Sequence, residues 1–97
     1  MLLGACGDIS VTANVAPKKM AAMCEAAMAG DAEQARRLNA ELDALHHDLF
    51  VESNPIPVKW ALEQMELIES GIRLPLTRLS IAAQGKLRPT LAKAGLL

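Results

Sequence analysis

The 97 residues are enough for one small domain at most. Hydrophobic residues make up 52% of the chain and aromatic residues only 2%, which favours helices packed through aliphatic side chains over a β-sandwich. The net charge is −1 and no long run of either sign occurs, so we expect no nucleic-acid partner. No apolar stretch approaches the ~18 residues of a membrane-spanning helix, no signal peptide is recognisable, and Cys6 and Cys24 make no disulfide framework. We therefore expect a cytoplasmic protein without a membrane partner.

The N-terminal third predicts one strand and one helix. Residues 8–15 alternate apolar and polar side chains and are rich in β-branched residues, which is typical of a strand. Helical spacing of apolar residues then predicts a helix over about 17–29, carried by Met20, Met23, Cys24, Ala27 and Met28. A single strand has no pairing partner within the chain, and a strand followed by a helix is half of a βαβ unit. The pattern indicates the end of a larger fold.

Three further helices are predicted, over about 31–51, 57–69 and 82–94. Asp31 suits the N-cap of the first, with Gln34 in capping-box position. The last contains Pro89, which predicts a break or a late start. The second opens with two prolines and carries the only tryptophan, Trp60, which we expect to be a buried packing anchor.

Two segments resemble a known enzyme family. They are Ile9 to Pro17 and, most specifically, Asn54-Pro55-Ile56-Pro57-Val58-Lys59-Trp60-Ala61-Leu62. Both are similar to dihydrodipicolinate synthase (4-hydroxy-tetrahydrodipicolinate synthase), and the similarity continues over essentially the whole chain through Ala29-Gly30-Asp31, Leu45-His46, Leu49-Phe50, Ile72 to Thr77 and Ala94-Gly95-Leu96-Leu97.

The resemblance implies a TIM (β/α)8 barrel with a C-terminal helical extension, usually assembled as a homotetramer. It implies a lyase of lysine and diaminopimelate biosynthesis that condenses pyruvate with aspartate semialdehyde through a lysine Schiff base. Residues 1–30 would be the last βα unit of the barrel, and 31–97 the extension. The catalytic lysine and tyrosine of the family would lie outside this C-terminal fragment. The partner of the fragment would be the missing barrel portion of the same polypeptide.

The fragment alone is therefore expected to be inactive, with no catalytic, metal or cofactor-binding residue and no cofactor. An alternative is a non-enzymatic helical module that pairs through its single strand with a barrel partner. A small self-standing enzyme is the third hypothesis, which the lack of a visible acid–base or nucleophile pair disfavours. Two departures from the family pattern are Glu66, where glycine is usual at a helix end, and Pro89.

Each chemically suggestive residue also has a structural interpretation. Lys59 follows the prolines in the first turn of a helix, outside any barrel, so we expect it to be structural rather than a Schiff-base residue. His46 and His47 are adjacent and cannot form the i, i+4 pair of a zinc site; His46 is expected to flank the leucine stripe and hydrogen-bond a neighbouring carbonyl.

The remaining candidates are weaker. Cys6 and Cys24 are expected to be small buried or half-buried thiols, and the methionines at 20, 23 and 28 core residues. Gly4 and Gly7 form a G-x-x-G too weak for a phosphate loop. Thr12 and Asn14 could line the barrel mouth without being catalytic.

Overall fold

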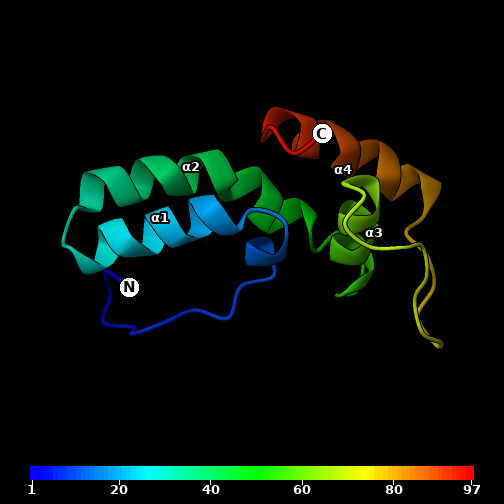
Figure 1. The fold of residues 1–97 in the computed structure, drawn as a ribbon, viewed down its shortest axis with the longest axis horizontal. Coiled ribbons are helices and arrows are strands. Elements are labelled where there is room, and N and C mark those ends of the chain that lie inside the picture. Colours follow the sequence, from blue (N-terminus) through cyan, green and yellow to red (C-terminus); the bar gives the residue numbers. More distant parts are fainter.

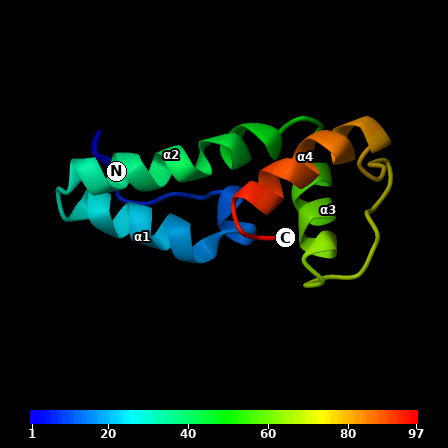
Figure 2. The same cartoon turned by 90° about the horizontal axis from the view of Figure 1, so that it is seen from above.

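The computed structural model describes residues 1–97 and consists of four α-helices and one short 3-10 helix (Figure 1). The elements are η1 (Thr12–Asn14), α1 (Pro17–Met28), α2 (Ala32–Asp48), α3 (Ile56–Gln64) and α4 (Ile81–Lys93). Helices α1 and α2 lie side by side as a hairpin, and α3 and α4 pack at the other end of the molecule (Figure 2). The prediction of a mainly helical chain is confirmed. None of the helices combines the length and apolar character needed to cross a bilayer.

The strand predicted over 8–15 is absent from the structure. Val11 already has helical backbone angles, and Thr12–Asn14 form the 3-10 turn η1. Residues 5–10 are irregular, and their N–H and C=O groups make no hydrogen bond to other backbone groups. A ladder needs a second strand, and no neighbouring strand exists in this chain. The side chain of Ile9, within the predicted strand, is fully exposed at 105%.

Three helices end in the same hydrogen-bonded motif. After α1, the N–H groups of Gly30 and Asp31 bond back to the carbonyls of Ala27 and Ala26, with Gly30 at φ 81°. Gly95 has the same role after α4, at φ 77°. This arrangement is the Schellman motif, which needs a left-handed residue just after the helix.

At the end of α3 the left-handed residue is Glu66, at φ 62°. Its N–H bonds to the carbonyl of Glu63 and that of Leu67 to Leu62, both at 3.0 Å. The prediction of a helix over 57–69 is therefore wrong at its C-terminal end, because this motif stops the helix at Gln64.

The start of α2 agrees with its predicted cap. The carboxylate of Asp31 accepts a hydrogen bond from the N–H of Gln34 at 3.1 Å. The helix ends at Asp48, three residues before the predicted end at 51, because the chain turns there through hydrogen bonds from Phe50 to His47 and from Val51 to Asp48.

Helix α4 continues through Pro89, contrary to the predicted break. Proline removes one N–H and crowds the carbonyl four residues earlier, which here belongs to Gly85. Both Gly85 and Pro89 are exposed, so water can reach the carbonyl that loses its partner. Ser80 caps the helix start by accepting from Ala83 N–H at 3.2 Å, and its hydroxyl donates to the Glu52 carboxylate.

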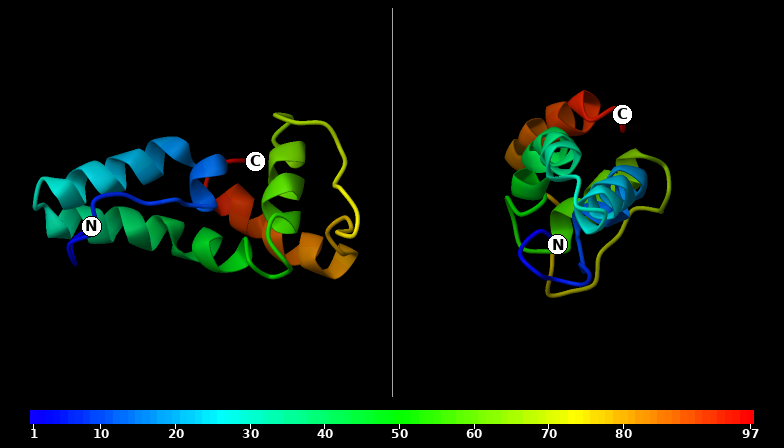
Figure 3. Two further views of the ribbon diagram at one scale, coloured as in Figure 1. Left: turned by 90° about the horizontal axis from the view of Figure 1, so that it is seen from below. Right: turned by 90° about the vertical axis from the view of Figure 1, so that its left-hand side faces the viewer.

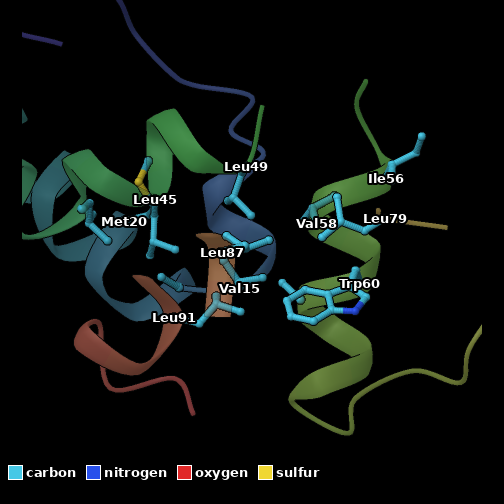
Figure 4. Packing of buried hydrophobic residues seen from close by; sticks show 13 residues of the cluster. Val15, Met20, Leu45, Leu49, Ile56, Val58, Trp60, Leu79, Leu87 and Leu91 are labelled. Carbon is cyan, nitrogen blue, oxygen red and sulfur yellow. The ribbon is translucent and has the colours of Figure 1, made fainter. Parts of the chain in front are cut away.

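The core forms where η1, the ends of α1 and α2, and helices α3 and α4 meet (Figure 4). It is aliphatic apart from Trp60, which is 4% exposed, so its predicted burial is confirmed. The guanidinium of Arg88 lies 5.1 Å from the centre of the Trp60 ring and also donates to Gln64 at 2.9 Å. The buried cluster contains Val15, Ala16, Met20, Leu42, Leu45, Leu49, Ile56, Val58, Trp60, Ala61, Leu79, Leu87 and Leu91.

The molecule is elongated and exposes much of its apolar surface. Its extents are 41 × 25 × 21 Å and its accessible surface is 6241 Å². A self-contained globular protein of 10.3 kDa is expected to expose about 5,400 Å². The N-terminal segment runs back along the α1–α2 hairpin, and part of the connection between α3 and α4 loops outward beyond these helices (Figure 3). Leu3, Ile9, Leu74 and Ile81 are among the exposed large side chains.

Candidate functional site

A groove of about 610 Å³ lies between the N-terminal segment and the α1–α2 hairpin. Eight of its ten lining residues are hydrophobic, and the only charged side chain is that of Arg36, beside Asn39. Proton transfer or nucleophilic attack requires a positioned acid, base or nucleophile pair. The thiol of Cys24 is the only nucleophilic side chain in the lining, and no histidine or carboxylate accompanies it. The groove suits packing against another apolar surface better than chemistry.

Lys59 lies on α3, half-buried, beside a very small hollow of about 10 Å³. Trp60, Glu63 and Arg78 line the same hollow. The guanidinium of Arg78 donates to both carboxylate oxygens of Glu63, at 2.7 and 3.0 Å. The space is too small to admit a keto acid beside the ammonium group, so the surroundings of Lys59 favour its structural interpretation.

The two histidines have different partners. Nδ1 of His46 lies 2.7 Å from Oγ1 of Thr12, whereas Nδ1 of His47 lies 3.1 Å from Oδ1 of Asp48. The expected carbonyl partner of His46 is therefore wrong, because the partner is a hydroxyl 34 residues earlier in the chain. No group of three histidine, cysteine or carboxylate side chains lies close enough together to hold a metal ion.

Asp48 is the one carboxyl group with a clearly shifted pKa. Burial by itself raises the pKa, because the charged form loses water. Hydrogen bonds from Thr90 and His47, with Coulombic attraction from Lys86 and His47, outweigh this effect and hold the pKa of Asp48 below its ordinary value of 3.8. The Thr90 hydroxyl donates to Oδ2 at 2.5 Å, so the charged carboxylate ties the end of α2 to α4. Sequence reasoning missed this pair because its members are 42 residues apart.

The other sequence candidates divide between core and surface. Cys24 is half-buried as expected, but Cys6, which lies in the irregular segment 5–10, is exposed. Met20 is buried, but Met28 is 70% exposed and is not a core residue. Thr12 is 2% exposed and Asn14 is exposed, so the turn η1 points one into the core and the other outward. The N–H of Gly4 donates to the carbonyl of Met1 at 3.0 Å, and Gly7 makes no backbone hydrogen bond.

Comparison with known proteins gives one consistent result. The sequence profile of the dihydrodipicolinate synthetase family matches residues 1–94. The chain is 69% identical over 97 residues to the 4-hydroxy-tetrahydrodipicolinate synthase of Alcanivorax borkumensis and 62% identical to that of Laribacter hongkongensis. Both alignments cover all of this chain and 33% of the relative.

Solved structures agree with the sequence comparison. The chain is similar to the chloride-inhibited dihydrodipicolinate synthase from Acinetobacter baumannii, solved with pyruvate, at a TM-score of 0.96 and 56% identity over 99% of this chain and 33% of that one. It is also similar to the Aquifex aeolicus enzyme, at a TM-score of 0.95 and 43% identity over 98% of this chain and 32% of that one.

Proposed function

The chain belongs to the dihydrodipicolinate synthetase family, and we propose that it is the C-terminal third of a 4-hydroxy-tetrahydrodipicolinate synthase. Such an enzyme is a lyase of lysine biosynthesis that condenses pyruvate with aspartate semialdehyde through a lysine Schiff base. In this proposal residues 1–30 are the last βα unit of a TIM barrel and residues 31–97 form the helical extension. The whole enzyme is a cytoplasmic homo-oligomer, usually a homotetramer in this family.

The observation that carries the proposal is the agreement in fold over nearly the whole chain, at a TM-score of 0.96 and 56% identity. Four helices, their connections and the irregular segments all superpose, so the likeness is not limited to a common helix pair. Because the chain spans about a third of its relatives, the activity belongs to a larger polypeptide.

The unpaired segment 5–10 supports its place in a barrel. Its backbone groups make no backbone hydrogen bond within the chain, and Ile9 is fully exposed. Neighbouring parallel strands would satisfy these groups, and the barrel layers would cover the side chain. The apolar groove along α1 and α2 would be filled by the same partner portion.

The role of this chain is then to complete the barrel and brace it, while the covalent chemistry is carried by residues elsewhere in the enzyme. The isolated chain is accordingly inactive. Its single half-buried candidate, Lys59, lacks both a substrate-sized cavity and a proton-transfer partner.

A chimeric enzyme tests the proposal. The matching third of the Alcanivorax borkumensis synthase is replaced by this chain, and condensation of pyruvate with aspartate semialdehyde is measured. We expect the chimera to be active. A chimera that folds and assembles like its parent but shows no activity would refute the proposal.

The isolated chain is treated in parallel with pyruvate and borohydride, which reduces any Schiff base to a stable adduct. We expect no adduct on the chain and one adduct on the chimera. An adduct mapped to Lys59 would contradict the assignment of catalysis to another part of the enzyme. Lys59→Arg in the chimera is the matched variant, and we expect it to leave adduct formation unchanged.

The second candidate, a non-enzymatic module that pairs with a barrel partner, draws on the same unpaired segment 5–10. Adding the isolated chain to a barrel that lacks this third distinguishes the two. Recovery of activity on mixing would mean that the chain binds and functions in trans. No binding on mixing, together with an active covalent chimera, would leave the continuous polypeptide as the only functional form.

A further inference from the structure

The N-terminal segment 1–16 is joined to helices α2 to α4 by a single hydrogen bond. That bond runs between Oγ1 of Thr12 and Nδ1 of His46, at 2.7 Å. All other hydrogen bonds of the segment are internal or lead into the first turn of α1, and no ion pair connects it to another element. The segment is otherwise held by packing of residues such as Val15 against the core.

We propose that His46 is a positioning residue of the synthase, which holds Thr12 and thereby fixes the turn η1 at the end of the last barrel strand. This inference rests on the function proposed above. In a TIM barrel the carboxyl ends of the strands form the active-site face. In this chain the turn Thr12–Asn14 comes just after the segment 5–10, which the proposed function places in the last barrel strand, so the turn would lie at the carboxyl end of that strand.

The bond is well placed to set the geometry of the turn. The carbonyl of Thr12 accepts from the N–H groups of Val15 and Ala16, at 3.1 and 2.9 Å. The Thr12 residue is thus held from its side chain by α2 and from its carbonyl by the start of α1. Because Thr12 is 2% exposed, water cannot easily replace His46 as the partner of the hydroxyl.

The hydroxyl can bond the ring in more than one protonation state. A threonine hydroxyl both donates and accepts, so it can serve either neutral tautomer of His46 and also the imidazolium. On the same helix, the His47 ring bonds the Asp48 carboxylate, which also accepts from Thr90, and neither group bonds His46. The inferred role of His46 is therefore mechanical.

The test uses five single variants of the active chimera. Thr12→Val and His46→Leu remove one partner each, and we expect both to lower kcat on the order of tenfold to a hundredfold, with KM for pyruvate little changed. Thr12→Ser keeps the hydroxyl and His46→Asn keeps a polar group near the position of Nδ1, so both should retain most of the activity. His47→Leu is the matched control, since the neighbouring ring is exposed, and it should leave kcat unchanged.

The double variant Thr12→Val/His46→Leu should be no worse than either single variant, because the two losses remove the same bond. Rates are compared well below the melting temperature of each variant, so that unfolding does not contribute. Equal kcat in His46→Leu and His47→Leu would overturn the inference, as would a failure of Thr12→Ser and His46→Asn to rescue.

A second measurement separates this inference from the proposed function. Hydrogen exchange at the amides of Val15 and Ala16 is measured in the unsubstituted chain and in the Thr12→Val chain. We expect faster exchange at these two amides in the variant, relative to amides in the middle of α2. Unchanged exchange overturns the positioning role even if the chimera is active. Faster exchange together with an inactive chimera supports the role of the Thr12–His46 bond in holding the turn but refutes the enzyme assignment.

Discussion

Replacing Glu66 with glycine should stabilise the chain. Glu66 is the only non-glycine residue with a positive φ, and it holds the position that Gly30 and Gly95 hold after α1 and α4. An L-residue in this left-handed conformation costs roughly 1–2 kcal/mol, because its Cβ crowds the neighbouring carbonyl. The side chain is exposed and makes no hydrogen bond or ion pair, so its removal sacrifices no contact.

The expected gain is smaller than the full cost of the left-handed conformation. Glycine loses more backbone freedom on folding, by roughly 0.5–1 kcal/mol. The net stabilisation from Glu66→Gly should therefore be about 0.5–1 kcal/mol. For a chain of this length, a change of that size corresponds to a rise of the melting temperature of about 2–8 °C.

Thermal melts followed by far-UV circular dichroism and by the fluorescence of Trp60 measure this change. Glu69→Gly is the matched control, because it removes the same charge from an exposed position without a positive φ. The control should be neutral or slightly destabilising, and Gly30→Glu should destabilise by an amount similar to the gain at Glu66. If Glu66→Gly and Glu69→Gly shift the melting temperature equally, the backbone argument is wrong.

Three further predictions concern α2. Because the folded pKa of Asp48 lies below its ordinary value of 3.8, its contribution to stability is present at neutral pH and is lost as the pH falls through the folded pKa. Thr90→Val removes the main lowering hydrogen bond and raises the folded pKa towards its ordinary value, so less stability should be lost on acidification, as followed by melts between pH 2 and 7; an identical pH dependence would refute the assignment. Asp31→Ala removes the N-cap and should cost about 1 kcal/mol in urea unfolding, whereas Asp43→Ala, within the helix and exposed, should cost less. Leu42→Ala empties a fully buried position and should cost roughly 2–5 kcal/mol; a cost below 1 kcal/mol would mean that α2 does not pack as described.

The local signals in the sequence were sufficient to place the helices. Asp31 predicted the start of α2 because a carboxylate at that position satisfies a free N–H of the first turn, and this depends on a few neighbouring residues only. The burial of Trp60 followed in the same way from its size and from the lack of other aromatic residues. The motif from Asn54 to Leu62 also indicated the family, which the comparisons confirm.

Several features that the sequence did not predict depend on distant partners. Residues 8–15 have the composition of a strand, but a strand exists only where another strand accepts its hydrogen bonds, and this chain offers none. The pairs Thr12–His46 and Asp48–Thr90 join residues 34 and 42 positions apart, so only the packing of η1 and α4 against α2 brings them together. Composition, caps and periodicity therefore determined the helices, and the resemblance of the motif from Asn54 to Leu62 indicated the family, because these signals lie within short stretches of chain. The tertiary structure decided which polar groups meet and where α3 ends, because those outcomes depend on backbone angles and contacts that no short stretch specifies.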